Sequence, residues 1–203
     1  METIKSNYQV KCATYSDIYE HLPTLNDYAS KCETIVECGM RSVVSSYAFA
    51  NGLLNNGSKN KQLISVDLDY STNIDPLKDA CKKADINFIF MMANDVKINL
   101  EPMDLLFIDT FHVKAHLQVE LKLHADKAKK YIILHDTTVD RLDGECVRNG
   151  WSAEKISLET GYSIEDINTG LWPAVEEFLE KHPEWVIEKE YTNNNGLTIL
   201  ARK

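Results

Sequence analysis

Short runs of apolar residues recur along the first two thirds of the chain, and the first four of them are nearly continuous rather than alternating with polar residues. Strands that are buried on both faces of a parallel sheet have this composition, because helices cover both sides. The runs predict five strands, over Thr34–Cys38, Gln62–Asp67, Asn87–Met92, Asp104–Asp109 and Tyr131–Leu134.

The segments between these runs have the spacing of amphipathic helices. In the longest of them, apolar residues recur at Val113, Leu117 and Leu121 while charged residues occupy the other faces. An N-terminal helix, capped by Ser16 or Asp17, is expected to cover the first strand. The predicted helices are Ser16–Lys31, Ser42–Leu54, Pro76–Ala84 and His112–Ala128.

The C-terminal part of the chain has a different pattern. A helix is predicted over Leu171–Lys181, and Pro183 lies just beyond it as a stop signal. Trp185–Tyr191 and Leu197–Ala201 then read as two strands, joined by the turn 192–196, whose Asn and Gly residues tolerate positive φ. The whole pattern predicts a doubly wound α/β fold with a mostly parallel sheet and an antiparallel C-terminal hairpin. In such folds a ligand binds outside the carboxyl ends of the strands, beside the first strand.

Length and composition fit one soluble domain over residues 1–203, since 44% of the residues are hydrophobic and 26% are charged. The sequence contains no apolar run of transmembrane length and no secretory signal pattern, so no membrane partner is expected. Its five cysteines form no CxxC pair, which favours reduced thiols and a cytoplasmic location. A homo-oligomer is compatible with this composition.

The formal net charge of −9 bears on the partner. A protein that neutralises several phosphates needs a clustered cationic face, whereas the lysines here are scattered and outnumbered by carboxylates. We therefore expect no nucleic-acid partner.

The turn after the first predicted strand is the first candidate binding segment. Glu37 ends the apolar strand, Gly39 permits a close backbone turn, and small hydroxyl residues including Ser45 open the next helix. Such a turn can hold a ligand against the free N–H groups of a helix N-terminus. A simple strand-to-helix turn has the same composition, so both interpretations remain open on this segment alone.

An acid also ends the second predicted strand. Asp67 could bind the two hydroxyl groups of a ribose, as acids at this position do in nucleotide-binding folds. A solvated aspartate at the end of a strand is the alternative interpretation.

The strongest candidate site combines two neighbouring strands that each end in an aspartate. Asp109 and Asp136 should converge at the carboxyl edge of the sheet, where two carboxylates repel each other unless a cation lies between them. Mg²⁺, which prefers oxygen ligands, would supply that cation. His112 follows Asp109 by three residues and could face the same cleft as a general base. Alternatively, His112 is a surface or core residue and Asp109 merely caps the following helix.

These motifs together resemble those of a known protein family. Glu37-x-Gly39 with Ser45, Asp67, Phe107–His112 and Leu134–Thr137 resemble class I S-adenosylmethionine-dependent methyltransferases. Within that class the chain is similar to the small O-methyltransferases grouped with cephalosporin hydroxylase and macrocin-type sugar methyltransferases. The resemblance extends from about Thr34 to the C-terminus and implies a seven-stranded sheet.

The resemblance implies a role for each matching residue. Glu37, Gly39 and Ser45 belong to the motif that lines the methionine and ribose part of the cofactor, Asp67 would hold the ribose hydroxyls, and Asp95 would lie near the adenine. Asp109 and Asp136 would bind Mg²⁺ or Mn²⁺, and His112 would take the proton of the acceptor hydroxyl. The chain departs from the family at Val43 and Val44, where glycines are common.

Residues 138–170 interrupt the pattern after the fifth strand. This segment carries Trp151 and Tyr162 together with Arg141, Glu145 and Arg148, a composition that suits a sugar with apolar ring faces and hydroxyl groups. We therefore expect an acceptor-side insertion and an O-methyltransferase for a sugar hydroxyl, free or in a glycan. A plain surface excursion or an oligomer contact is the alternative interpretation of this segment. The same acids would serve a catechol-like or phenolic acceptor, and a non-catalytic binding module on this fold is the remaining alternative.

Overall fold

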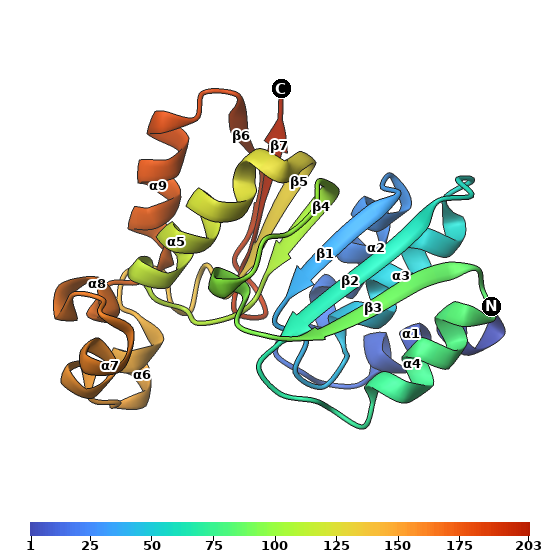
Figure 1. The fold of residues 1–203 in the computed structure, drawn as a ribbon, viewed down its shortest axis with the longest axis horizontal. Helices are drawn as coiled ribbons and strands as arrows, with labels where there is room; N and C mark the ends of the chain where they lie inside the picture. The colour runs from blue at the N-terminus through green and yellow to red at the C-terminus, as the bar shows by residue number, and fades with distance from the viewer.

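One seven-stranded sheet lies at the centre of the computed structural model, which describes residues 1–203 (Figure 1). The strand order is β3-β2-β1-β4-β5-β7-β6; the first five strands in the chain run parallel, and β7 runs antiparallel to both of its neighbours. The predicted doubly wound sheet with its reversed hairpin is thereby confirmed. The strands are β1 Thr34–Cys38, β2 Lys61–Asp67, β3 Ile86–Met92, β4 Met103–Ile108, β5 Ala128–His135, β6 Trp185–Tyr191 and β7 Leu197–Arg202.

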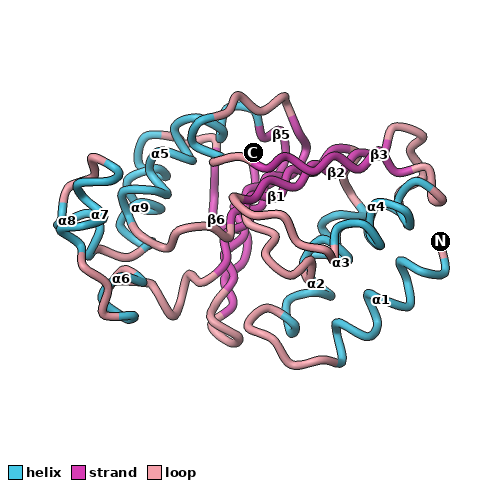
Figure 2. The backbone as a smooth tube through the Cα atoms, turned by 60° about the horizontal axis from the view of Figure 1, so that its bottom comes forward, coloured by secondary structure: helices cyan, strands magenta, loops and turns pink.

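Helices cover both faces of the sheet. Four of them pack on one face and two on the other, and the two views separate these layers (Figures 1 and 2). The first face carries α1 Glu2–Ala13, α2 Leu22–Ser30, α3 Ser45–Asn55 and α4 Ile74–Lys82. The second carries α5 Lys114–His124 and α9 Leu171–Lys181.

The alternation of side chains along each buried strand produces the two cores. In β1, Ile35 belongs to the core under α1–α4, whereas Val36 belongs to the core under α5 and α9. In β4, Phe107 and Ile108 divide between the two cores in the same way. Both faces of these strands are therefore apolar, which explains the continuous apolar runs in the sequence.

Residues 138–170 form a small helical subassembly after β5. It consists of α6 Glu145–Asn149, α7 Ala153–Thr160 and α8 Ile164–Asn168, which gather at the end of the molecule opposite α1 (Figures 1 and 2). Ser152 and Ser163 cap α7 and α8 by accepting hydrogen bonds from backbone N–H groups. A separate apolar cluster that includes Val113 and Ile167 joins the subassembly to the loop before α5.

The N-terminal region corrects one predicted helix. Residues 14–18 form no helix, and the segment predicted as one helix over Ser16–Lys31 is a short 3-10 turn, Tyr19–His21, followed by α2. Pro23 lies in the first turn of α2, where its missing N–H costs nothing. Helix α1 was not predicted, because Ile4 is its one fully buried residue and the helix carries little apolar periodicity.

Several other helix ends differ from the prediction. The helix after β1 begins at Ser45 rather than Ser42, because the preceding turn contains residues with positive φ. The helix after β4 spans Lys114–His124 rather than His112–Ala128, and a 3-10 turn, Ala125–Lys127, follows it. A third such turn, Asp95–Lys97, follows β3. None of the helices is both long enough and apolar enough to cross a membrane.

Candidate active site

A cavity of about 610 Å³ opens at the carboxyl ends of the central parallel strands. The turns after β1, β2, β3 and β4 each contribute to it, and the insertion closes it from the other side with Glu145 and Tyr162. This is the ligand position expected for a doubly wound sheet, and its volume is that of a pocket for a small organic molecule. Four of the residues expected to bind a cofactor line it: Gly39, Asp67, Asp95 and Asp109.

Gly39 begins the turn after β1. Its φ of +82° lies in the left-handed region, and a Cβ placed on it would lie 1.8 Å from the carbonyl oxygen of Asp109. Only glycine fits there, because any side chain would collide with the backbone of the neighbouring strand's end. The turn therefore packs directly against the segment that carries the candidate metal ligand.

Asp67 holds the same turn from the other side. Its Oδ2 accepts hydrogen bonds from the backbone N–H groups of Met40 at 2.9 Å and Arg41 at 2.8 Å, and its Oδ1 accepts one from Asp69 at 3.2 Å. The side chain also lines the cavity. Asp67 thus shapes the turn in addition to facing the place expected for a ribose.

Glu37 and Ser45, in contrast, do not line the cavity. Glu37 is fully buried, and its carboxylate accepts hydrogen bonds from the hydroxyl groups of Ser45, Ser46 and Ser65. The alternation along β1 places Glu37 on the same side of the strand as Ile35, beneath the start of α3. The carboxylate therefore fixes the turn from behind.

Burial dominates the ionisation of Glu37. It raises the pKa of this carboxyl from 4.5 to about 7, and the Asp109 charge adds to the increase, while the three serine hydroxyls lower it less. Glu37 is consequently a buried acid that titrates near neutral pH.

The turn between β1 and α3 contains an unusual backbone conformation. Val43, which is fully buried, has a φ of +65°, and Arg41 has a φ of +40°. A β-branched residue is strongly disfavoured in this region, at a cost on the order of 1–3 kcal/mol. Val43 stands where glycine is common in the family that the sequence resembles. The chain therefore holds a valine in a backbone conformation typical of glycine, with the valine side chain in the core.

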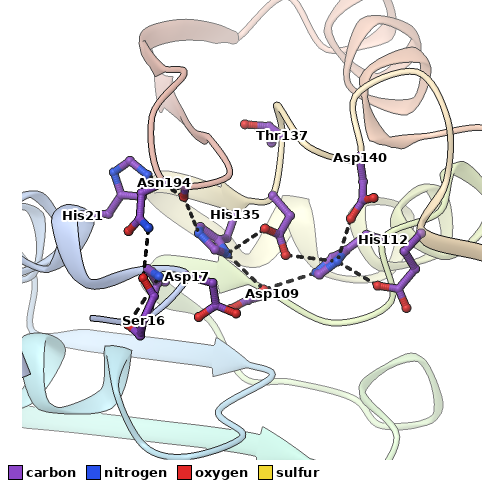
Figure 3. Close-up of polar contacts among 12 residues, drawn as sticks. Ser16, Asp17, His21, Asp109, His112, His135, Thr137, Asp140 and Asn194 are labelled. Atoms are coloured by element: carbon purple, nitrogen blue, oxygen red, sulfur yellow. Dashed lines mark hydrogen bonds and ion pairs between the residues drawn. The ribbon is translucent and has the colours of Figure 1, made fainter. Parts of the chain in front are cut away.

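His112 lies at the centre of a cluster of carboxylates (Figure 3). Its Nε2 is 3.2 Å from Asp109 Oδ1. Its Nδ1 faces three further carboxylate oxygens: Asp136 Oδ2 at 3.1 Å, Asp140 Oδ2 at 3.2 Å and Glu145 Oε2 at 2.9 Å. The structure thus brings together the predicted Asp109, His112 and Asp136.

His135 connects the two predicted metal-binding aspartates from behind. Its Nδ1 lies 3.3 Å from Asp109 Oδ1 and 3.5 Å from Asp136 Oδ1, and the ring is almost completely buried. Its Nε2 faces the carbonyl oxygen of Asn194 in the β6–β7 turn (Figure 3). His135 therefore fixes the orientation of the Asp109 carboxylate. Asp136 follows His135 with a φ of +57°, a left-handed conformation that aspartate tolerates better than most residues.

Charges in the cluster are strongly coupled. Burial would favour a neutral His112, but the neighbouring carboxylates of Asp109, Asp140 and Glu145 raise its pKa well above the usual range. Burial would likewise raise the pKa of Asp109, yet His135 and His112 hold it below the usual range. Without a metal ion, the arrangement favours an imidazolium among carboxylates.

Two members of this cluster, Asp140 and Glu145, were not predicted to contact His112. Asp140 lies four residues after Asp136, in a turn in which its N–H donates a hydrogen bond to the Asp136 carbonyl oxygen. Arg148 donates a bidentate pair of hydrogen bonds to the Asp140 carboxylate at 2.7 and 2.8 Å. Glu145 begins α6, and its side chain reaches His112 and the cavity. In the sequence, the spacing of four residues between Asp136 and Asp140 was the signal that could have predicted this contact. The position of Glu145 depends on how the insertion folds back.

The cluster has the donors and the unsatisfied atoms that a divalent cation requires. Asp136 Oδ1 is buried and has no hydrogen-bond partner, and none of the three carboxylate contacts of the buried His112 Nδ1 has hydrogen-bond geometry. Ligand atoms of Asp109, His112 and Asp136 all lie within 4.8 Å of one another, as do those of His112, Asp140 and Glu145. Carboxylate oxygens in this number suit Mg²⁺ or Mn²⁺, so the residues fit the metal that the sequence predicts.

His112 and Asp136 do not line the cavity itself. Asp109 and Glu145 line the cavity, and both contact His112. They therefore form the wall between the His112 ring and the cavity. His112 is 12% exposed and Asp136 is 8% exposed. The imidazole and the Asp136 carboxylate therefore lie behind the cavity wall.

The N-terminal segment and the C-terminal turn cover the other side of the site. Asp17 pairs with Arg41, which lines the cavity, at 2.5 Å. Asn194 donates a hydrogen bond to the carbonyl oxygen of Ser16 and accepts one from the N–H of Glu20 (Figure 3). These contacts hold the loop before α2 over the carboxyl ends of the strands.

Known structures share this architecture. The chain aligns along its whole length with 91% of an O-methyltransferase from Bacillus cereus in complex with S-adenosylhomocysteine (SAH), at 14% identity and a TM-score of 0.59. It also aligns along its whole length with 88% of an SAH-bound methyltransferase from Podospora anserina, at 16% identity and a TM-score of 0.58. An O-methyltransferase from Streptomyces achromogenes in complex with S-adenosylmethionine (SAM) gives 10% identity, full coverage of this chain, 90% coverage of the other and a TM-score of 0.55.

The chain therefore has the same fold as these methyltransferases, as the sequence motifs predict. No protein-family model and no curated protein sequence matches the chain. At these identities the comparison establishes the fold, and the chemistry depends on the site.

Proposed function

We propose that this protein is an O-methyltransferase that transfers the methyl group of SAM to a hydroxyl group held beside a divalent metal ion. The observation that carries the proposal is the carboxylate cluster around His112 at the ends of β4 and β5, adjacent to the cavity of a methyltransferase fold. The solved structures of this fold that are bound to SAM or SAH support the choice of cofactor.

The cavity suits the parts of SAM. Gly39 and Asp67 would border the methionine and ribose portions, and Asp95, in the turn after β3, would lie near the adenine. SAM carries an already activated methyl group, so the protein has mainly to align the donor and the acceptor. Glu37 and Ser45 would support this site from behind by fixing the turn.

Asp109 and Asp136 would hold Mg²⁺ or Mn²⁺, and Glu145 is the best candidate for a third ligand. Asp140 is less suited to direct coordination because both of its oxygens already accept hydrogen bonds from Arg148. The metal would lower the cost of deprotonating an acceptor hydroxyl. It would also offset the repulsion among the surrounding carboxylates.

His112 would accept the hydroxyl proton at Nδ1. Asp109 would receive the hydrogen bond of the opposite ring nitrogen, Nε2–H, and so keep Nδ1 free as the acceptor. In a neutral ring with Nε2–H, the Nδ1 lone pair would face the carboxylates of Asp136, Asp140 and Glu145. The lone pair and the carboxylates repel each other, so this arrangement is favourable only with a cation among them. His135 would keep Asp109 in place throughout.

For the acceptor, we propose a sugar hydroxyl, free or in a glycan. The insertion presents carboxylate and hydroxyl groups to the cavity through Glu145, Glu159, Thr160 and Tyr162. Such groups suit an acceptor with several hydroxyls. Arg141 and Arg148 are less available than the sequence analysis assumed, because Arg141 stacks on Trp172 and Arg148 pairs with Asp140. A catechol-like acceptor remains the second candidate, since the paired acids would serve it equally.

Calorimetry with SAH tests the cofactor class. We expect binding at micromolar concentration, and an absence of binding at about 1 mM SAH would favour a non-catalytic module instead. Transfer of labelled methyl from SAM to panels of sugars and phenols then identifies the acceptor class. Methylation of phenols alone would overturn the sugar proposal while leaving the methyltransferase proposal intact.

A further inference from the structure

A second group of acids and an imidazole lies beside the same cavity, on the turn after β3 and on α5. Asp95, in the turn after β3, approaches His116 and Glu120, which lie four residues apart on one face of α5. His116 Nε2 is 3.5 Å from Asp95 Oδ1 and 3.8 Å from Glu120 Oε1. The proposed methyl transfer uses neither His116 nor Glu120.

Two oxygen atoms of this group are buried without any hydrogen-bond partner. They are Asp95 Oδ2 and Glu120 Oε2, on residues that are 7% and 1% exposed. An unsatisfied buried carboxylate oxygen is costly, and two such oxygens beside each other require a proton or a cation between them. Both possibilities can be distinguished by experiment.

Two of the three side chains, those of Glu120 and His116, are oriented by a further contact. Thr110 donates a hydrogen bond to Glu120 Oε1 at 2.6 Å, and His116 Nδ1 lies 3.2 Å from the hydroxyl oxygen of Tyr162. When Nδ1–H donates to Tyr162, the lone pair of Nε2 faces the two carboxylates. Histidines that bind metals are oriented through the opposite ring nitrogen in the same way.

The geometry points to a second metal site, formed by Asp95, His116 and Glu120, for a divalent transition metal such as Zn²⁺. Tetrahedral Zn²⁺ with bonds of about 2.0–2.2 Å separates its ligand atoms by roughly 3.3–3.6 Å, close to the distances observed here. One nitrogen and two carboxylate ligands favour Zn²⁺ over Mg²⁺. Because Asp95 and His116 line the cavity, the site is open to solution and can load and exchange its metal.

The first test measures Zn²⁺ binding by calorimetry to the Asp109→Asn/Asp136→Asn variant, in which the His112 cluster has lost both predicted metal-binding carboxylates. We expect one equivalent with a micromolar or tighter dissociation constant. Adding His116→Gln should weaken that binding at least about 100-fold, as loss of a direct ligand does. The matched control is His182→Gln, which alters another histidine with neighbouring acids, at the surface, and should leave the tight equivalent unchanged.

A second measurement keeps the proposal falsifiable if the double variant does not fold. Wild-type protein saturated with Mg²⁺ is titrated with Co²⁺, whose visible absorption reports tetrahedral coordination. The band should be present in wild type and lost in Glu120→Gln. The proposal is overturned if folded protein binds no Zn²⁺ at about 100 μM, or if His116→Gln binds it as tightly as its parent. Either result would mean that Asp95 and Glu120 share a proton.

Discussion

Gly39 packs so closely against Asp109 that the turn after β1 and the end of β4 form a single unit: a Cβ on Gly39 would lie 1.8 Å from the Asp109 carbonyl oxygen. The proposed cofactor turn and the proposed metal ligand are thus positioned by the same contact. A change at Gly39 should therefore disturb both.

We expect Gly39→Ala to lower the free energy of unfolding by about 3 kcal/mol, because the added methyl collides with backbone and the residue has a positive φ. SAH affinity should fall in any protein that still folds. Gly57→Ala is the control, since a Cβ there meets nothing within 4 Å. Urea denaturation of both variants provides the measurement, and equal stability would contradict the close contact.

The positive φ of Val43 predicts an unusual order of stability. At an ordinary buried valine, the glycine variant is less stable than the alanine variant by roughly 1–2 kcal/mol, through the lost methyl and the greater freedom of the unfolded chain. At Val43 the strain relieved by glycine should offset this difference. We therefore expect Val43→Gly and Val43→Ala to be about equally stable.

Val113 supplies the comparison for that experiment, because it is also fully buried but has a φ of −134°. Val113→Gly should be clearly less stable than Val113→Ala. The measurement is the difference in the free energy of unfolding between the glycine and alanine variants at each position. If this difference is the same at Val43 and Val113, Val43 carries no backbone strain.

Glu37 predicts a fall in stability as the pH rises. Its pKa is about 7 in the folded protein against 4.5 as the ordinary value, so between these pH values the folded state holds more protons than the unfolded state. Raising the pH through this window should therefore lower the free energy of unfolding, by about 3 kcal/mol over the full shift.

Glu37→Gln removes the titration while preserving the shape of the side chain. Denaturation of both proteins at several pH values from 4.5 to 8 should show the wild type losing stability relative to the variant. Parallel pH profiles would indicate that Glu37 stays charged when buried.

His112→Ala tests the proposed general base. Turnover should fall by about 10²–10⁴-fold, while the dissociation constant of SAH should change little, because the imidazole lies behind the wall of the cavity. His182→Ala, at a partly exposed histidine far from this cluster in the sequence, is the control. Undiminished turnover would exclude His112 as the base, whereas loss of SAH binding would assign it a structural role.

The metal proposal predicts which carboxylates matter for Mn²⁺ binding. Asp136→Asn should weaken binding by at least about tenfold, because the amide removes one negative ligand. Electron paramagnetic resonance of free Mn²⁺ measures this directly, with exposed Asp79→Asn as the control. EDTA should abolish turnover, and activity that survives it would contradict metal assistance.

Glu145→Gln separates two roles in the same assay. A ligand role requires weaker Mn²⁺ binding. If Glu145 only covers His112, the variant should bind Mn²⁺ like the wild type.

Local patterns in the sequence determined the sheet. Five parallel strands, the reversed hairpin and the acids at strand ends could be predicted because apolar runs, alternation and turn residues act over a few neighbours. The expected burial of the third strand on both faces was wrong, because β3 lies at the edge of the sheet. The same logic predicted that Asp109, His112 and Asp136 would meet, since the ends of adjacent parallel strands lie at one edge. Helix α1 was not predicted because Ile4 is its one fully buried residue.

Only the tertiary structure decided how this site is enclosed. Asp140 and Glu145 reach His112 because the insertion folds back through its own small core, which no periodicity encodes. Glu37 points to the side of β1 that faces α3, so it does not line the cavity. The packing of the turn after β1 gives Val43 a positive φ. These features depend on contacts between segments far apart in the chain, whose geometry is fixed by packing rather than by local preference.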